Sequence, residues 1–362
     1  MQKSIVRSVR AGERESQDEQ DGAQGGKGYH HGGGNTVAQE VGGGFCHISG
    51  DGVRSTACHG EEIALTVLLD TQPVLGLGDA PQVAGAQHHG TYDGGGCTKS
   101  TAALESLCQR YPGKVNVMLV PAASVIYPEN VPAGAPLLNE EPYLDQLSSA
   151  VQAAGGRFVD VRDPLRSHKD EYLYYRTDHH WTSLGAYYAY SQLCEALGLT
   201  PFDPAAHTAL TRDGFYGTHY SKARTWNAVP DTITYYELQN ALTIWNVTGP
   251  GQPTEGTTTG LYDTDKLNVY DKYAMFLHGN NGQSRVEGDG SGKILVIKDS
   301  YANCFVPYLT ANYAAVDVVD FRNYNYGLDQ LIADNDYDQI LVLYSFDSFK
   351  GDPYLYRAGV TG

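Results

Sequence analysis

The chain has 362 residues, and its 41% hydrophobic and 11% aromatic side chains can form a packed core, which excludes wholesale disorder. Its formal net charge is −17, and without a basic stretch to neutralise phosphates the sequence argues against a nucleic acid as partner. No apolar run has the length of a membrane span, and residues 1–20 lack the apolar core of a signal peptide.

Residues 1–97 have an unusual composition. They hold half of the 42 glycines and six of the 12 histidines, but only two of the 27 tyrosines. Such a segment buries too little apolar surface to offset its chain entropy, so we expect it to be disordered, or to stand aberrantly in place of a normal N-terminal segment. Its histidines are irregularly spaced among glycines, which disfavours a metal-binding tract.

The six cysteines do not form a C-x-x-C pair, so the sequence predicts neither a zinc knuckle nor a thioredoxin-like site. Cys108, Cys194 and Cys304 fall in helical patterns and are expected to be small buried hydrophobic residues. Cys46 and Cys58 could pair in an oxidising compartment.

From residue 98 the chain alternates between helical and strand patterns. The first predicted elements are a helix at 102–111, a strand at 115–120, a helix at 144–154, a strand at 158–161 and a helix at 182–197. Pro121 ends the first strand, and Gly155 and Gly198 end helices. We therefore expect residues 98–362 to form the catalytic domain.

Residues 201–290 break this alternation with Thr- and Tyr-rich pieces that are typical of strands, such as 232–236 and 243–247. We expect a β-rich insertion of short strands or hairpins beside the main sheet. Strand patterns separated by helices then return at 294–297, 316–319 and 340–343. This order predicts an α/β fold, a mostly parallel sheet flanked by helices on both faces.

Residues 177–182, Thr-Asp-His-His-Trp-Thr, are the most informative feature for function. A histidine that acts as a general base needs a carboxylate to fix its tautomer and stabilise its imidazolium. Extended backbone would place Asp178 and His180 on one side and turn His179 away. The alternative is that the histidines are polar residues at a helix start, where Asp178 or Thr182 serves as N-cap.

Ser300 is the candidate nucleophile. It follows the strand at 294–297 and precedes a predicted helix at 301–313, so it is expected outside the carboxyl edge of the sheet. The free backbone N–H groups of that helix start would stabilise an oxyanion. The alternative is that Asp299 or Ser300 serves only as N-cap.

The segments 115–121, 174–181, 215–218, 298–303 and 340–344 resemble those of the DHHW proteins. These are similar to the alginate O-acetylation proteins and, more distantly, to the SGNH hydrolases. The resemblance covers residues 98–362 and implies an SGNH-like fold. Its Asp-x-His motif and later serine correspond to Asp178, His180 and Ser300. SGNH hydrolases place the serine first and use Asp-x-x-His, so the order here is permuted.

The resemblance implies a serine-dependent acyl esterase or O-acetyltransferase that acts on an extracytoplasmic polysaccharide. In that family Ser300 would be the nucleophile, His180 the general base and Asp178 the orienting carboxylate. The protein would act in the cell envelope or after secretion, with a membrane-bound partner as acyl donor. No cofactor is expected.

Further side chains are candidates for substrate binding. They flank the motif or lie where strands end; they are His179, Tyr175, Arg176, Asn303, Arg322 and Tyr324. We expect Asn303 to donate to the oxyanion, and Arg322 and Tyr324 to hold an anionic sugar or an acyl oxygen. His219 is expected to line the same cleft.

Two other functions fit the residues. In a metal-dependent hydrolase, the cluster at 178–180 would join His168 or His219, although adjacent histidines rarely converge on one ion. A non-catalytic glycan-binding surface protein would stack sugars on exposed aromatic side chains. The candidates for that role are Trp226, Tyr235, Tyr236 and Trp245.

Overall fold

The computed structural model describes residues 66–67, 86–87, 95–245 and 255–361. All of them belong to the unit Glu62–Gly362. Nearly all of the segment 1–97 lies outside the described residues, as do Cys46 and Cys58. The expected disorder of that segment and the expected cysteine pair therefore stay predictions.

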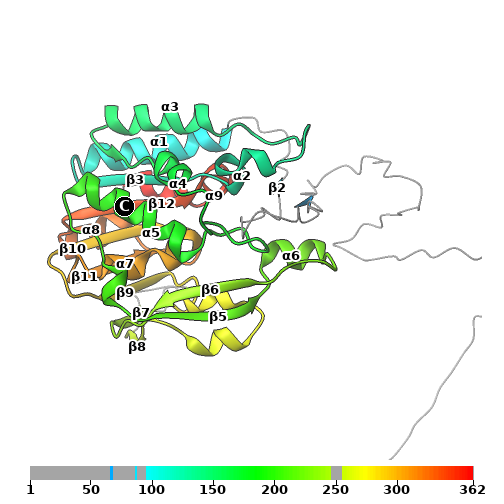
Figure 1. The fold of residues 1–362 in the computed structure, drawn as a ribbon. Coiled ribbons are helices and arrows are strands. Elements are labelled where there is room, and N and C mark those ends of the chain that lie inside the picture. Colours follow the sequence, from blue (N-terminus) through cyan, green and yellow to red (C-terminus); the bar gives the residue numbers. More distant parts are fainter. Residues whose placement is uncertain (1–65, 68–85, 88–94, 246–254, 362) are drawn as a thin grey trace, which may run out of the picture. The chain divides into compact units, whose positions relative to one another are not determined.

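An eight-stranded sheet forms the centre of the fold, with the strand order β4-β3-β12-β10-β11-β9-β7-β8 (Figure 1). The first five strands run parallel to one another: β4 (Arg157–Phe158), β3 (Val115–Val120), β12 (Gln339–Ser345), β10 (Lys293–Lys298) and β11 (Ala315–Val319). The last three are antiparallel: β9 (Gln283–Glu287), β7 (Ala241–Trp245) and β8 (Thr257–Gly260). The predicted mostly parallel sheet is confirmed.

Helices cover both faces of this sheet. One face packs against α1 (Gly95–Arg110), α3 (Glu141–Ala153), α8 (Leu328–Asn335) and α9 (Phe346–Gly351). The other packs against α2 (Ala123–Ile126), α4 (Arg162–Ser167), α5 (Ser183–Leu197) and α7 (Val306–Leu309). Strand β10 shows why both faces are covered. The side chains of Leu295 and Ile297 belong to the core cluster on the α1 face, whereas those of Ile294 and Val296 belong to the core cluster on the α5 face. A central parallel strand buries both faces, so its sequence is a continuous apolar run.

Residues 201–290 contribute strands in two places. A separate antiparallel pair is formed by β5 (Ala209–Phe215) and β6 (Asp231–Tyr236), with α6 (Thr218–Ala223) between them. The sequence suggested that strands β7, β8 and β9 lie beside the main sheet, and this is wrong. They extend it, because β9 hydrogen-bonds along the free edge of β11.

The short elements complete the secondary structure of the described residues. They are the strands β1 (Thr66–Val67) and β2 (Ala86–Gln87) and the 3₁₀ turns η1 (Pro128–Asn130), η2 (Pro204–Ala206), η3 (Thr264–Asn268), η4 (Lys272–Met275), η5 (Ser300–Cys304) and η6 (Leu355–Gly359). Among the helices in the described part of the chain, none is long and apolar enough to cross a membrane.

Two predicted helices differ from those observed. The helix predicted at 301–313 is instead the 3₁₀ turn η5 followed by the four-residue helix α7, because Pro307 lacks an N–H and suits only the start of a new helix. Helix α1 begins at Gly95, well before residue 102. A Cβ on Gly96 would lie 1.8 Å from the carbonyl oxygen of Lys350, so only glycine allows this close approach to α9.

Candidate active site

The motif at 177–182 forms a bent loop between two points of backbone pairing. Tyr174 and Trp181 form an isolated antiparallel bridge, and Asp231 accepts hydrogen bonds from the backbone of the loop. The carboxylate of Asp231 is fully buried and accepts the backbone amides of Arg176 at 2.9 Å and Thr177 at 2.8 Å. This buried carboxylate fixes the backbone immediately before Asp178.

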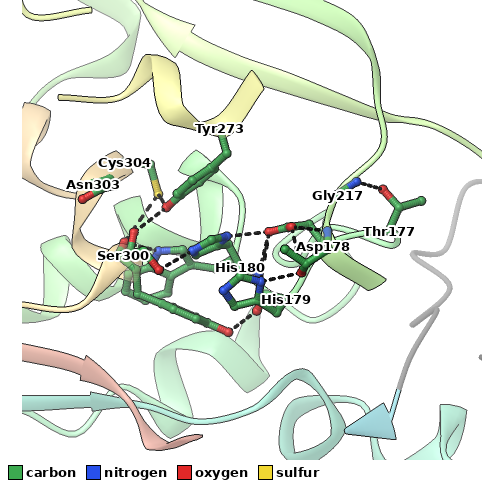
Figure 2. Close-up of polar contacts among 12 residues, drawn as sticks. Thr177, Asp178, His179, His180, Gly217, Tyr273, Ser300, Asn303 and Cys304 are labelled. Carbon is green, nitrogen blue, oxygen red and sulfur yellow. Dashed lines mark hydrogen bonds and ion pairs between the residues drawn. The ribbon is translucent and has the colours of Figure 1, made fainter. Parts of the chain in front are cut away.

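The three candidate catalytic side chains form one chain of hydrogen bonds (Figure 2). His180 Nδ1 lies 2.5 Å from Asp178 Oδ1, and His180 Nε2 lies 2.7 Å from Ser300 Oγ. An ionised carboxylate can only accept, so Nδ1 carries the proton and Nε2 is left to accept from the serine hydroxyl. This is the tautomer that a general base needs. Asp178 and His180 are buried, whereas Ser300 is partly exposed.

Asp178 is held by α6 as well as by the imidazole. Its Oδ2 accepts the backbone amide of Thr218 at 2.8 Å and the Thr218 hydroxyl at 3.1 Å, and its Oδ1 also accepts the amide of His180 at 3.0 Å. Gly217 packs directly on the carboxylate, since a Cβ there would lie 2.2 Å from Oδ2. The carboxylate therefore has one position, aimed at His180.

Tyr273, from η4, supports the other two members. Its ring stacks on the His180 imidazole, with centroids 3.9 Å apart and planes 13° apart. Its hydroxyl donates to the backbone oxygen of Ser300 at 3.0 Å (Figure 2). Sequence reasoning missed Tyr273, Thr218 and Gly217 as site residues. The only signal was that Gly217 and Thr218 lie in a segment on which the family resemblance rests.

Trp181 and Tyr301 join the motif loop to the turn that carries the nucleophile. Trp181 is fully buried, and its Nε1 donates to the backbone oxygen of Tyr301 at 2.9 Å. The Tyr301 hydroxyl in turn donates to the backbone oxygen of His179. These two bonds connect the loop that carries His180 to the turn that carries Ser300. They keep the two side chains within hydrogen-bond distance, although 120 residues separate them in sequence.

Burial and neighbouring charges set the protonation of the site. Burial lowers the pKa of His180, and the adjacent His179 lowers it further, against the pull of Asp178 in the other direction. Burial alone would raise the pKa of Asp178, but His180 and His179 outweigh it and hold that pKa well below its usual range. The resting state is therefore a neutral imidazole beside an ionised carboxylate.

This protonation state predicts the acid limb of the pH profile. If His180 acts as a general base it must be neutral, so ester turnover would fall as pH drops through the pKa of His180 in the free enzyme. Because burial holds that pKa below its usual value near 6.5, we expect the midpoint of the decline in kcat/KM for a small acetyl ester to lie below pH 6.5. A decline already centred above pH 7 would contradict this environment for His180.

Two expectations about the motif need correction. His179 does not point away, since its ring lies 3.8 Å from that of His180 and its Nδ1 lies 2.7 Å from Thr218 Oγ1. The reason is that residues 176–180 bend and are not extended. The N-cap of α5 is Thr182, whose hydroxyl accepts the amide of Gly185, so Asp178 is not needed there.

Two of the expected oxyanion donors already have a hydrogen-bond partner in the protein. The amide of Tyr301, the first after the nucleophile, donates to Asp299 Oδ1 at 2.9 Å. Asn303 is buried, and its Nδ2 donates to Asn280 Oδ1 at 3.1 Å. A 3₁₀ turn capped by Asp299 thus replaces the open helix start that the sequence suggested.

The remaining candidates separate into buried and exposed side chains. Tyr175 is buried between aromatic rings, and Tyr324 is buried in the core cluster on the α1 face. Their contact with a substrate stays a prediction. Arg176 packs over the Tyr172 ring. Arg322 reaches the surface and forms a bidentate pair with Asp320.

The histidines proposed as additional metal ligands lie in different surroundings. His168 stacks on Tyr188 and bonds to Glu171, away from the motif. His219 is buried with its ring centroid 6.4 Å from that of His179, and burial lowers its pKa to about 4. The cluster of Asp178, His179 and His180 brings ligand atoms within 4.8 Å of one another. Two of those side chains, Asp178 and His180, also form the hydrogen-bond chain to Ser300.

The aromatic side chains considered for glycan stacking are mostly not exposed. Trp226 is 94% exposed, but Tyr235, Tyr236 and Trp245 are half-buried and pack against the two core clusters. A sugar-binding surface made by these four residues is therefore not formed among the described residues.

Comparisons with known proteins were made for the whole chain. The model of the DHHW protein family matches residues 140–319, which include the motif, Gly217 and Ser300. No curated protein sequence matches the chain.

The chain is similar to several solved structures, two of which share its fold with TM-scores above 0.5. A DHHW family protein from Eubacterium siraeum is 24% identical, with 75% of this chain and 90% of that chain covered and a TM-score of 0.59. Bacillus cereus PatB1, determined with a sulfonyl adduct, is 16% identical, with 81% and 98% covered and a TM-score of 0.63. The O-acetyltransferase domain of Pseudomonas putida AlgJ is 16% identical, with 73% and 89% covered and a TM-score of 0.42. With the family match over residues 140–319 and the shared fold, the resemblance to the DHHW family that residues 177–181 carry is confirmed.

Proposed function

We propose that this protein is a serine-dependent acyl esterase or O-acetyltransferase in which Ser300 is the nucleophile. His180 is its general base and acid, and Asp178 orients the imidazole. One observation carries the proposal: a single imidazole joins a buried carboxylate at 2.5 Å to a partly exposed serine hydroxyl at 2.7 Å. A helix cap or a structural histidine would not require this chain of three groups.

The chemistry follows from the hydrogen-bond directions. Ser300 Oγ attacks the carbonyl carbon of an acyl ester while its proton moves to His180 Nε2. The tetrahedral intermediate collapses, the alcohol leaves with that proton, and an acyl-Ser300 ester remains. Water or a sugar hydroxyl then attacks this ester, gives its proton to Nε2, and releases Ser300 with its hydroxyl restored. Asp178 stays ionised throughout and stabilises the imidazolium in each half.

The substrate class follows from the family resemblance. Similarity to the alginate O-acetylation proteins supports a polysaccharide as the acyl acceptor or as the esterified substrate, a site of action outside the cytoplasmic membrane, and a membrane-bound acyl donor. At 24% and 16% identity, the similarity to the solved structures is evidence for the fold alone. Whether water or sugar resolves the acyl-enzyme depends on what binds beside Ser300.

Covalent labelling tests the nucleophile directly. An aryl sulfonyl fluoride should sulfonylate Ser300, because Nε2 of His180 accepts the hydroxyl proton as the S–O bond forms and fluoride leaves. We expect mass spectrometry of the full chain to find one adduct on the peptide containing Ser300, no adduct in Ser300→Ala, and much slower labelling in His180→Ala. Ser348→Ala, at another partly exposed serine, should label like the parent. Equal labelling of parent and Ser300→Ala would refute the proposed nucleophile.

A metal-dependent hydrolase is the second candidate, since the ligand atoms of Asp178, His179 and His180 lie within 4.8 Å of one another. In that case ester turnover would depend on bound metal and would be lost on chelation. The serine mechanism is the simpler account, because it uses the bonds already present between Asp178, His180 and Ser300.

A further inference from the structure

A pocket of about 430 Å³ opens next to the nucleophile, and we call it the edge pocket. Its lining comes from the carboxyl ends of β10, β11 and β12, from α9 and the loop after it, and from the motif loop. The residues are His179, Asp299, Tyr301, Arg322, Ser345, Asp347, Ser348, Gly351, Asp352, Pro353 and Tyr354. Its size is within the range of about 300–1,000 Å³ for small-molecule sites.

The edge pocket is adjacent to the reacting atoms without containing them. Asp299 and Tyr301, which flank Ser300 in sequence, both line it, as does His179, the neighbour of His180. The residues on both sides of the nucleophile therefore contribute to the wall of the edge pocket. A group bound in the edge pocket would lie beside an acyl group on Ser300, which is where an acyl acceptor must be held.

One wall of the edge pocket presents an aromatic ring to solvent. Tyr354 is 36% exposed, although it is a large apolar side chain in an otherwise well-packed domain. The Arg357 guanidinium lies 5.1 Å from its ring centroid and supports it by a cation–π contact. An exposed ring held in this way can stack on the apolar face of a sugar ring, while its hydroxyl stays available to a polar partner.

A fixed carboxylate lies next to this ring. Asp352 Oδ1 accepts the backbone amides of Tyr354 at 2.6 Å and Leu355 at 3.2 Å, which holds the side chain in place. Its Oδ2 has no hydrogen-bond partner among residues 95–245 and 255–361. A carboxylate oxygen is an acceptor only, so its natural partner in this position is a hydroxyl group.

The lining of the edge pocket is rich in carboxylates. It holds Asp299, Asp347 and Asp352 but only one cation, Arg322. The Arg322 guanidinium already makes a bidentate contact with Asp320. A uronate brought into the edge pocket would therefore meet more like charge than opposite charge in the lining. An uncharged sugar would not incur that repulsion.

We infer that the edge pocket is an acceptor subsite for an uncharged glycosyl unit, stacked on Tyr354 and hydrogen-bonded to Asp352. This inference rests on the proposed function and names its substrate class. It differs from the expectation that Arg322 holds an anionic sugar. A hydroxyl of the bound unit attacks the acyl-Ser300 carbonyl, the Oγ–acyl bond breaks as the new ester forms, and the proton passes through His180 to Ser300.

Direct binding tests the subsite independently of catalysis. Cellotriose, an uncharged trisaccharide, is titrated into the full chain and followed by isothermal titration calorimetry, beside a trimer of mannuronate. We expect cellotriose to bind more tightly, with about tenfold weaker binding in Tyr354→Ala and in Asp352→Asn. Tyr356→Ala is the matched control, because Tyr356 is 52% exposed, belongs to the same turn η6 and does not line the edge pocket.

A second readout separates the subsite from the proposed nucleophile. With 4-nitrophenyl acetate as donor, Tyr354→Ala should transfer less acetyl to cellotriose per nitrophenol released than the parent, whereas Tyr356→Ala should keep the ratio of the parent. Tighter binding of the mannuronate trimer, absence of cellotriose binding, or parent-like binding by both variants would each overturn the subsite. Cellotriose binding that depends on Tyr354, in a protein whose Ser300 cannot be labelled, would instead refute the proposed catalytic function.

Discussion

Replacing His180 by alanine is expected to lower kcat/KM for a small acetyl ester by about a hundred- to ten-thousand-fold, the usual worth of a general base. His179→Ala should cost far less. The reason lies in the different contacts of two adjacent imidazoles. His180 joins Asp178 to Ser300, whereas the side chain of His179 contacts Thr218 Oγ1 and lines the edge pocket. The bond that His179 accepts from Tyr301 is made by its backbone oxygen, which alanine retains.

Steady-state kinetics on 4-nitrophenyl acetate, with melting temperatures to confirm folding, decide between the two histidines. If His179→Ala were the more damaging, the assignment of the general base would be wrong. If both variants kept their activity and a chelator abolished it, the metal-dependent hydrolase would replace the serine mechanism. The pair is a stringent test because the substitutions are identical and one residue apart.

The parts of the fold that were predictable carry local signals. Helix α5 runs over Ser183–Leu197, close to the predicted 182–197, because Thr182 caps its start and Gly198 ends it with a φ of 67°. Strands β3 and β10 are apolar over most of their length, as is typical of buried parallel strands. Pro307 marks a break in the sequence, but the apolar residues across 301–313 favour one continuous helix.

The site was predictable only in part. Ser300 was identified by its position after a buried strand, and Asp178 and His180 by the Asp-x-His resemblance. The structure brings these three residues within hydrogen-bond distance. Nothing in the local sequence marks Asp231 or Tyr273, since each acts on a partner far along the chain. Asp231 lies within a β-rich stretch and Tyr273 in a short 3₁₀ turn, and neither stretch shows a periodicity that would reveal its neighbours.

Each residue of the motif has a separate task in the structure. Thr177 is anchored by Asp231, Asp178 and His180 make the hydrogen-bond chain, His179 borders the edge pocket, and Trp181 binds the backbone of the serine turn. Five consecutive side chains thus connect the buried support, the catalytic groups and the pocket wall.

Gly217→Ala is expected to disable the site through one methyl group. A Cβ at this position would lie 2.2 Å from both Cβ and Oδ2 of Asp178, so the carboxylate must move away from His180. The backbone itself is not strained, because Gly217 has a φ of −93° that any residue adopts. Loss of the orienting carboxylate costs up to about ten-thousand-fold in kcat, since the imidazole then no longer keeps the correct tautomer. We expect a loss approaching that size in ester turnover.

Gly327→Ala is the matched control for this steric argument. Gly217 and Gly327 are both N-cap residues without a side-chain cap bond, at the starts of α6 and α8, so both substitutions carry the same small cost of alanine at an N-cap. A Cβ on Gly327 meets nothing within 4 Å. Gly327→Ala should therefore keep full ester turnover, whereas Gly217→Ala should lose it even where its melting temperature shows a folded protein. Undiminished turnover in folded Gly217→Ala would mean that catalysis does not need Asp178 in the position seen here, and the orienting role assigned to that carboxylate would fall.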